Sequence, residues 1–164
     1  LNVFARLLES HQSLRGVIIG AGVKDQLAPI VAQHGLTESV TLENSMQDLE
    51  EICPGLDLLV VPSVRGEAFP NVIGEAMASG VPIVATPLGD VPDLVGDAGI
   101  VARGTSQEDI HESVKHAISI LHTWAPDNER RIDPRSRIAK FDIPTLQRNY
   151  RGLYESTLAS VGNR

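Results

Sequence analysis

Cysteine is almost absent from this chain, and aromatic and positively charged residues are scarce. Cys53 is the only cysteine, which excludes an internal disulfide framework and a zinc site built from several cysteines. Aromatic residues make up 4% of the 164 residues, and 14 Lys and Arg against 21 Asp and Glu give a net charge of -7. This balance argues against a general nucleic-acid binder. A local phosphate site is still allowed, because backbone amides at a helix N-terminus bind anions without net positive charge.

Long hydrophobic runs are also lacking. No apolar segment approaches the roughly 20 residues that span a bilayer, and no basic-then-apolar secretory leader follows Leu1. We therefore predict a cytoplasmic protein. A peripheral location at the inner face of the membrane is compatible with this prediction. The length and the hydrophobic content of 42% are ordinary for one globular domain.

Short apolar runs alternate with helical patterns along the chain. The runs are rich in β-branched residues and apolar at successive positions, as in strands covered on both faces. They lie at residues 16–19, 40–42, 58–61, 82–85 and 99–101. Helices are predicted near residues 24–33, 46–52, 71–79, 106–122 and 143–159. This alternation predicts an α/β fold, a doubly wound and Rossmann-like parallel sheet with helices on both faces.

Polar residues suggest how some of these segments begin. Ser106 is placed to cap the helix near residues 106–122, with Asp109 three residues later, and Asp90 is placed to cap a short turn. The polar segment 123–134 holds two prolines and is predicted to be a connector. The final helix has Leu146, Tyr150, Leu153, Tyr154 and Leu158 on one face.

The segment from Asp57 to Thr86 is the most informative. A buried strand ends there in Pro62-Ser63, and a loop carrying Glu67 leads to a helix that opens at Pro70-Asn71. Ligands of doubly wound sheets bind at the carboxyl ends of the strands. This loop is therefore the expected place for a binding site.

The first turn of that helix predicts an anion site. The N–H groups of Asn71, Val72 and Ile73 lack intrahelical acceptors, and the positive end of the helix dipole favours a diphosphate. Glu75 shares a helical face with Asn71, and its carboxylate can accept hydrogen bonds from both hydroxyls of a ribose. Glu67 precedes the helix and can reach sugar hydroxyls beyond the phosphates. The spacing alone fits equally the plainer alternative, in which both glutamates are solvated surface residues.

Residues 57–101 resemble the signature of retaining GT-B-fold glycosyltransferases, the glycosyl transferases group 1 family. That signature is a Pro-Ser ending a strand, a glutamate, seven residues, a second glutamate, small residues and Gly-x-Pro. The sequence has Pro62-Ser63, Glu67, Glu75, Gly80 and Pro82 in that order. Gly89, Pro92 and Gly99 match a weaker continuation, and the resemblance covers about residues 1–121.

The resemblance implies a role for each matching position. It places Glu75 on the ribose of a nucleoside diphosphate-sugar donor and Glu67, the expected catalytic residue, against the transferred sugar. The implied reaction moves that sugar to an acceptor hydroxyl with retention of configuration, without a metal or another cofactor. The other donor-binding positions that it implies are Ala68, Phe69, Pro70, Asn71 and Val72 for the diphosphate and sugar, Glu43 and Asn44 near the base, and Gly20 and Gly22 beside the cleft.

The sequence departs from the family pattern in two places. Ala68 stands where the family usually has glycine. The family domain also opens with a strand and a loop whose arginine and lysine bind the phosphates, whereas this chain starts at the next helix. In the expected strand order 3-2-1-4-5-6 that strand is central, and its loss leaves two open inner edges. We expect residues before Leu1, or a partner chain, to fill the gap.

The predicted organisation follows from the resemblance. Residues 1–122 form a nucleotide-sugar-binding, Rossmann-like domain that is incomplete at its N-terminus, and residues 123–164 form a connector and C-terminal helices of the same domain. The expected partners are the nucleotide-sugar donor, an unknown carbohydrate, lipid or small-molecule acceptor, and a missing N-terminal domain, but no nucleic acid. The isolated chain should bind donor weakly without turnover. Polysaccharide biosynthesis is a common setting for such enzymes.

Three alternatives stay open. A sugar-nucleotide epimerase has the same fold, and a non-catalytic nucleotide-binding or interaction module needs no turnover. Gly20-Ala21-Gly22 suggests an NAD-dependent domain, but Asp25 occupies the third glycine position of that motif. The spacing of His111, His116 and His122 predicts solvated helix positions and no metal site. Cys53 is predicted to be a small buried apolar residue.

Overall fold

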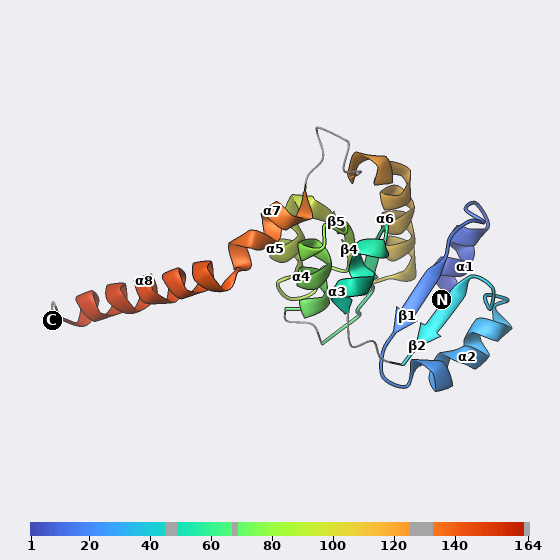
Figure 1. Cartoon of the computed structure of the whole chain (residues 1–164), viewed down its shortest axis with the longest axis horizontal. Helices are drawn as coiled ribbons and strands as arrows, with labels where there is room; N and C mark the ends of the chain where they lie inside the picture. Colours follow the sequence, from blue (N-terminus) through green and yellow to red (C-terminus); the bar gives the residue numbers. More distant parts are fainter. Residues whose placement is uncertain (45–48, 67–68, 125–132, 163–164) are drawn as a thin grey trace.

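The computed structural model of the chain describes residues 1–44, 49–66, 69–124 and 133–162. Within these residues, parallel strands form two sheets (Figure 1). The first sheet pairs β1 (Gly16–Ile19) with β2 (Val40–Glu43). The second holds β3 (Leu59–Val61), β4 (Ile83–Ala85) and β5 (Gly99–Val101) in that order. The five predicted strands are therefore confirmed.

The two sheets are separated at the place where the sequence predicts a missing central strand. In the predicted order the absent strand lies between β1 and β3, and in the described part of the chain these two strands do not pair with each other. The strands beside this gap are less covered than β4. Val17 is 37% exposed and Val60 is half-buried, whereas every residue of β4 is buried. Within each sheet the described strands therefore pair as the doubly wound arrangement predicts, and none of them joins β1 to β3.

Helices cover both faces of the three-stranded sheet, and the residues of β4 alternate between two apolar clusters. Ile83 and Ala85 pack on one side with Ile73 and Leu94, whereas Val84 packs on the other side. The helices of the first side are α4 (Asn71–Ala78) and α5 (Val91–Val95), and those of the second are α1 (Asn2–Leu8) and α6 (Gln107–Ile120).

The helix α1 connects the two sheets. Its Leu7 is buried in the apolar cluster that contains Val84 of the three-stranded sheet. Its Phe4 packs against the cluster that contains Val40 of the two-stranded sheet. Since β1 and β3 do not pair, the side chains of α1 supply part of the packing that joins the two halves of the fold.

The helix α7 (Pro134–Ile138) was not predicted from the sequence pattern. Asp133 caps α7, because its side chain accepts a hydrogen bond from the Arg135 amide at 3.0 Å, and Pro134 opens the helix. The prediction of a connector through residue 134 is therefore wrong at its end. The other elements are α2 (Val23–Gln33), α3 (Leu49–Ile52), α7 (Pro134–Ile138), α8 (Ile143–Gly162), η1 (Cys53–Gly55), η2 (Gly96–Ala98), η3 (Leu121–Trp124) and η4 (Ala139–Phe141).

The two predicted caps have different outcomes. The Ser106 hydroxyl accepts a hydrogen bond from the Asp109 amide at 3.1 Å, which confirms it as the cap of α6. Asp90 occupies the N-cap position of α5, but its side chain makes no capping hydrogen bond. That prediction is wrong in its chemistry, because residue position alone does not orient a side chain toward the free amides.

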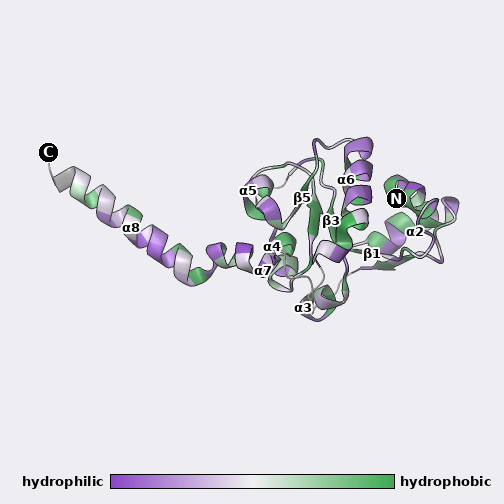
Figure 2. Cartoon of the chain, turned by 90° about the horizontal axis from the view of Figure 1, so that it is seen from above, coloured by the Kyte–Doolittle hydropathy of each residue, from purple (hydrophilic) through white to green (hydrophobic). Residues whose placement is uncertain are grey.

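The helix α8 projects away from the rest of the molecule (Figures 1 and 2). Of its side chains from residue 143 to 160, only that of Thr145 is half-buried and the others are exposed. Its predicted apolar face is thus present without cover from the described residues. Among the described helices, none combines the length and apolarity that crossing a bilayer requires.

Candidate functional site

Two groups of predicted site residues lie at the carboxyl ends of the strands, where doubly wound sheets bind their ligands. One group follows β3 and includes the start of α4. The other follows β1 and β2 and includes the start of α2. The two groups belong to different sheets, and among the described strands β1 and β3 do not pair.

Among the described residues, no side chain caps the backbone N–H groups at the N-terminus of α4. Pro70 is the N-cap residue, with an extended ψ of 109°. Its carbonyl oxygen accepts a hydrogen bond from the Ile73 amide at 3.1 Å. The prediction of three free amides is therefore wrong for Ile73, whose N–H closes a tight first turn. The amides of Asn71 and Val72 are the donors that this end of the helix offers an anion.

Glu75 lies one turn further along α4 and is exposed. Its carboxylate acts electrostatically on Cys53 of η1. Burial raises the pKa of the Cys53 thiol, and the negative charge of Glu75 raises it further. Cys53 is 2% exposed, which confirms the predicted buried position. Glu75 therefore offers an exposed carboxylate one helical turn along α4 from the amides of Asn71 and Val72.

The segment before α4 is described only in part. Phe69 is 43% exposed, and Pro70 is buried. The predicted catalytic Glu67 and the donor-binding Ala68 lie outside the described residues. Phe69 contacts Phe141 of η4, a residue that the sequence pattern did not single out.

The second group is held together by hydrogen bonds at the start of α2. The Asn44 side chain accepts a hydrogen bond from the Lys24 amide at 2.9 Å, and the Gly20 amide donates to the Glu43 carbonyl at 3.0 Å. The Lys24 ammonium lies 2.8 Å from a Glu43 carboxylate oxygen. Gly22 begins α2 with a φ of 73°, a left-handed conformation that favours glycine. Residues predicted separately near the base and beside the cleft are therefore brought together.

The N-termini of α2 and α4 differ in their side-chain capping, which bears on whether Gly20-Ala21-Gly22 is a dinucleotide-binding motif. The Asn44 side chain accepts a hydrogen bond from the Lys24 amide at the N-terminus of α2. Gly20 and Gly22 therefore shape a turn next to a helix end that already has a polar cap. In the part of the chain that the structure describes, the N-terminus of α4 has no such side-chain cap. Of these two helix ends, α4 is the better anion site, and the dinucleotide motif at Gly20-Ala21-Gly22 gains no support.

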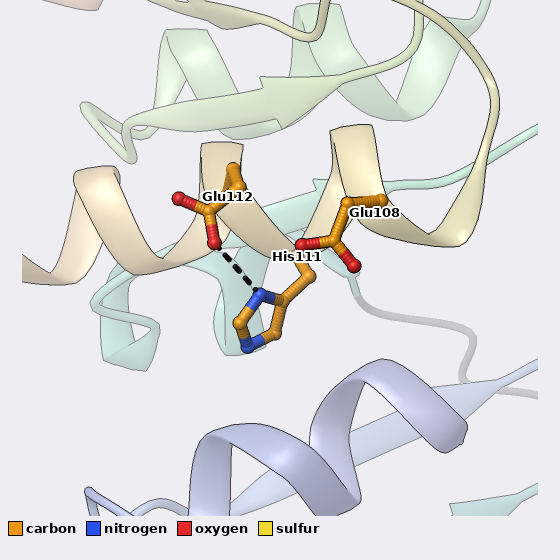
Figure 3. A group of neighbouring side chains, drawn as sticks. All are labelled: Glu108, His111 and Glu112. Carbon is orange, nitrogen blue, oxygen red and sulfur yellow. Dashed lines mark hydrogen bonds and ion pairs between the residues drawn. The ribbon is translucent and has the colours of Figure 1, made fainter.

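A cluster on α6 is the one group of at least three His, Cys, Asp or Glu side chains in the described residues that could hold a metal ion (Figure 3). The ligand atoms of Glu108, His111 and Glu112 lie within 4.8 Å of one another. His111 is buried, so its predicted solvated position is wrong, because this face of α6 packs against α1. Glu108 already pairs with Arg6 at 2.8 Å, and that cation opposes a metal ion at the same carboxylate.

The comparisons with known families and proteins agree with this fold. Residues 1–120 match the family model described as "Glycosyl transferases group 1". A D-inositol 3-phosphate glycosyltransferase of Mycobacterium sp. (strain KMS) is 32% identical over 135 residues, which cover 80% of this chain and 30% of that protein. An exopolysaccharide phosphotransferase of Streptomyces coelicolor is 32% identical over 118 residues, covering 70% of this chain and 12% of that protein. The chain thus spans less than a third of the length of these curated relatives.

Solved structures give the same result for the fold. A glycosyltransferase from Rickettsia africae superposes with a TM-score of 0.78 and 18% identity, covering 95% of this chain and 43% of that chain. The structure of HepE from Anabaena in complex with UDP-glucose superposes with a TM-score of 0.73 and 20% identity, covering 94% of this chain and 44% of that chain.

Proposed function

The chain belongs to the glycosyl transferases group 1 family, and we propose that it is the donor-binding part of a transferase that uses a nucleoside diphosphate-sugar. In this proposal the sugar passes to an acceptor hydroxyl with retention of configuration. Residues 1–122 hold the nucleotide-sugar, and residues 123–164 complete the same domain. No metal or other cofactor is assigned a part in the reaction.

The observation that carries the proposal is the uncapped N-terminus of α4. The amides of Asn71 and Val72 are available there at the carboxyl edge of the sheet. Negative charge develops on the diphosphate as the bond to the sugar breaks, and preorganised amides stabilise that charge without reorganising. Glu75 stands one turn away, where its carboxylate can accept both ribose hydroxyl hydrogen bonds.

Other roles in this proposal rest on the resemblance of the sequence. Glu67 contacts the transferred sugar as the catalytic residue, and Ala68 and Phe69 lie along the diphosphate and sugar. Asn44 and Glu43 lie near the base. UDP is the first nucleotide to test, because the similar HepE structure is a complex with UDP-glucose.

A second domain is the partner that we propose for turnover. The aligned glycosyltransferase chain from Rickettsia africae is more than twice as long as its matched part. Apolar side chains, among them Leu146 and Tyr150, are exposed along α8, the helix that follows Phe141 in the chain. In this proposal the second domain packs on the exposed apolar face of α8 and supplies the acceptor half of the cleft.

Calorimetric titration of the 164-residue chain with UDP, GDP, ADP and NAD⁺ tests the donor site. We expect saturable binding of one nucleoside diphosphate. Glu75→Ala should weaken it by about 1–3 kcal/mol, the cost of losing hydrogen bonds to a charged group. Glu155→Ala is the matched control, since Glu155 is an exposed glutamate on α8. An equal effect of both variants, or binding of NAD⁺ alone, would contradict the proposal.

Product analysis separates a transferase from a sugar-nucleotide epimerase. The chain alone is expected to give neither product, because it carries one half of the cleft. A longer protein that contains this sequence should release a nucleoside diphosphate and form a glycoside. Conversion of one sugar nucleotide into its epimer would instead assign the epimerase.

A further inference from the structure

The segment formed by α7 and η4 runs along the whole length of α4. Arg135 contacts the C-terminal end of α4, Ile138 faces its middle, and Phe141 contacts the residue before its N-cap. The two segments are therefore antiparallel neighbours. The segment Pro134–Phe141 lies against the helix whose N-terminus carries the proposed diphosphate site.

The C-terminal end of α4 is held by a charged side chain. The Arg135 guanidinium donates a hydrogen bond to the Ser79 carbonyl oxygen at 3.1 Å. A cation at this end interacts favourably with the helix dipole and with the free carbonyl groups. Gly80 has a φ of 83°, and a Cβ atom there would lie 2.6 Å from the same guanidinium. The close approach of Arg135 therefore depends on a glycine at the end of α4.

The middle of α4 is held by an apolar contact. Ile138 is partly buried against the core cluster that includes Ile73 and Met77. A Cβ atom at Gly74 would stand 3.6 Å from the Ile138 Cδ1 atom, an ordinary van der Waals distance, so Ile138 lies directly against this part of the helix. This contact keeps the α7–η4 segment in place along the helix.

The N-terminal end of α4 is reached by an aromatic pair. The Phe69 and Phe141 ring centroids are 5.8 Å apart with an interplanar angle of 58°. A tilted arrangement at this distance is favourable for two aromatic rings. Phe69 and Phe141 are 43% and 42% exposed, so neither ring is buried in the core. Phe69 directly precedes Pro70, the N-cap of α4, so the ring contact restrains the backbone that leads into the amides of Asn71 and Val72.

We infer that Phe141 is a positioning residue of the donor site, which acts through Phe69 to hold the N-terminus of α4 in its binding conformation. This inference rests on the proposed function, because it assigns the Asn71 and Val72 amides to the donor diphosphate. Phe141 also ends η4, directly before the Asp142 cap of α8. The same contact therefore lies at the point where the chain enters α8.

Fluorine NMR of the chain labelled with 4-fluorophenylalanine tests the inference. The chain has three phenylalanines, and Phe4 packs in a different apolar cluster, so its signal is an internal reference. Phe141→Leu should shift the Phe69 signal and leave the Phe4 signal in place. The nucleoside diphosphate that binds best among UDP, GDP and ADP should shift the Phe69 and Phe141 signals together in the wild type.

Binding affinity gives the second readout. Phe141→Leu should weaken binding of that nucleotide about two- to tenfold, the range that one aromatic pair contributes. Phe141→Tyr keeps the ring and should bind like the wild type. Leu146→Ala is the matched control, because Leu146 is an exposed apolar residue one turn into α8. The thermal midpoint of all three variants should stay within the range that surface substitutions produce.

The outcomes separate this inference from the function on which it rests. If the wild type binds none of the three nucleotides, the proposed function fails and the inference fails with it. If the wild type binds one of them and Phe141→Leu binds it equally well, only the inference is overturned. A loss of binding that Phe141→Tyr does not restore would also contradict it, since the ring would then not be the operative group.

Discussion

The Arg6 guanidinium lies 2.8 Å from the Glu108 carboxylate and joins α1 to α6. The sequence separates these residues widely, and the contact depends on α1 crossing from one sheet to the other. The pair is exposed, so screening by water and salt limits its energy. It marks the place where the two halves of the fold meet.

The acid stability of the chain should depend on this pair. The hydrogen bond from Arg6 lowers the pKa of Glu108 from its ordinary value of 4.5. A lowered folded-state pKa contributes stability that is complete above pH 4.5 and is lost as the pH falls through the lower folded-state value. Arg6→Ala should therefore show a smaller loss of thermal midpoint between pH 5 and pH 3, about the range in which carboxylates titrate.

Arg15→Ala is a suitable control for that experiment, because Arg15 is an exposed arginine whose described hydrogen bonds go to nearby backbone carbonyls. Its acid profile should follow that of the wild type. Equal acid profiles for Arg6→Ala and the wild type would show that the pair contributes nothing to pH dependence.

Removal of the cap of α6 should cost measurable stability. Ser106 accepts the Asp109 amide at 3.1 Å, and loss of an N-cap side chain typically costs about 1 kcal/mol. Ser106→Ala should lower the free energy of unfolding in urea by about that amount. Ser119→Ala is the control, because its hydroxyl donates to a carbonyl within the same helix and caps no free amide. A larger effect at Ser119 would contradict this account.

Cys53 should resist alkylation until the chain opens locally. Burial raises the pKa of its thiol, so little reactive thiolate forms near neutral pH. Because Cys53 is the only cysteine, mass spectrometry after iodoacetamide treatment reports this position alone. We expect slow labelling in buffer and rapid labelling in urea. Rapid labelling in buffer would mean that η1 opens readily.

Hydrogen exchange should reveal the gap between the sheets. Leu59 donates to Pro82, so by alternation the Val60 amide points away from β4. In β1 the Gly16 and Gly20 amides donate toward β2. By the same alternation, the Val17 amide points away from β2 and toward the gap. Both amides should exchange faster than that of Val84, which lies between two strands. Equal protection would indicate that another strand fills the gap.

Sequence patterns alone determined the strands, the start of the site helix and the family. β-Branched apolar runs predicted all five described strands, because a strand covered on both faces leaves a local signature. The spacing of Pro62-Ser63, Glu75 and Gly80 indicated the family that residues 1–120 match. The cap at Ser106 was also predictable, because the Ser106 hydroxyl acceptor and the Asp109 amide donor are only three residues apart in the sequence.

The tertiary structure decided what depends on residues far apart in the chain. The approach of Phe141 to Phe69 and the contact of Lys24 with Asn44 leave no periodic signal, because each joins separate elements. His111 looked solvated by spacing and is buried, since α1 packs over it. Local patterns record which residues need cover, and only the packed chain decides which distant residue supplies it.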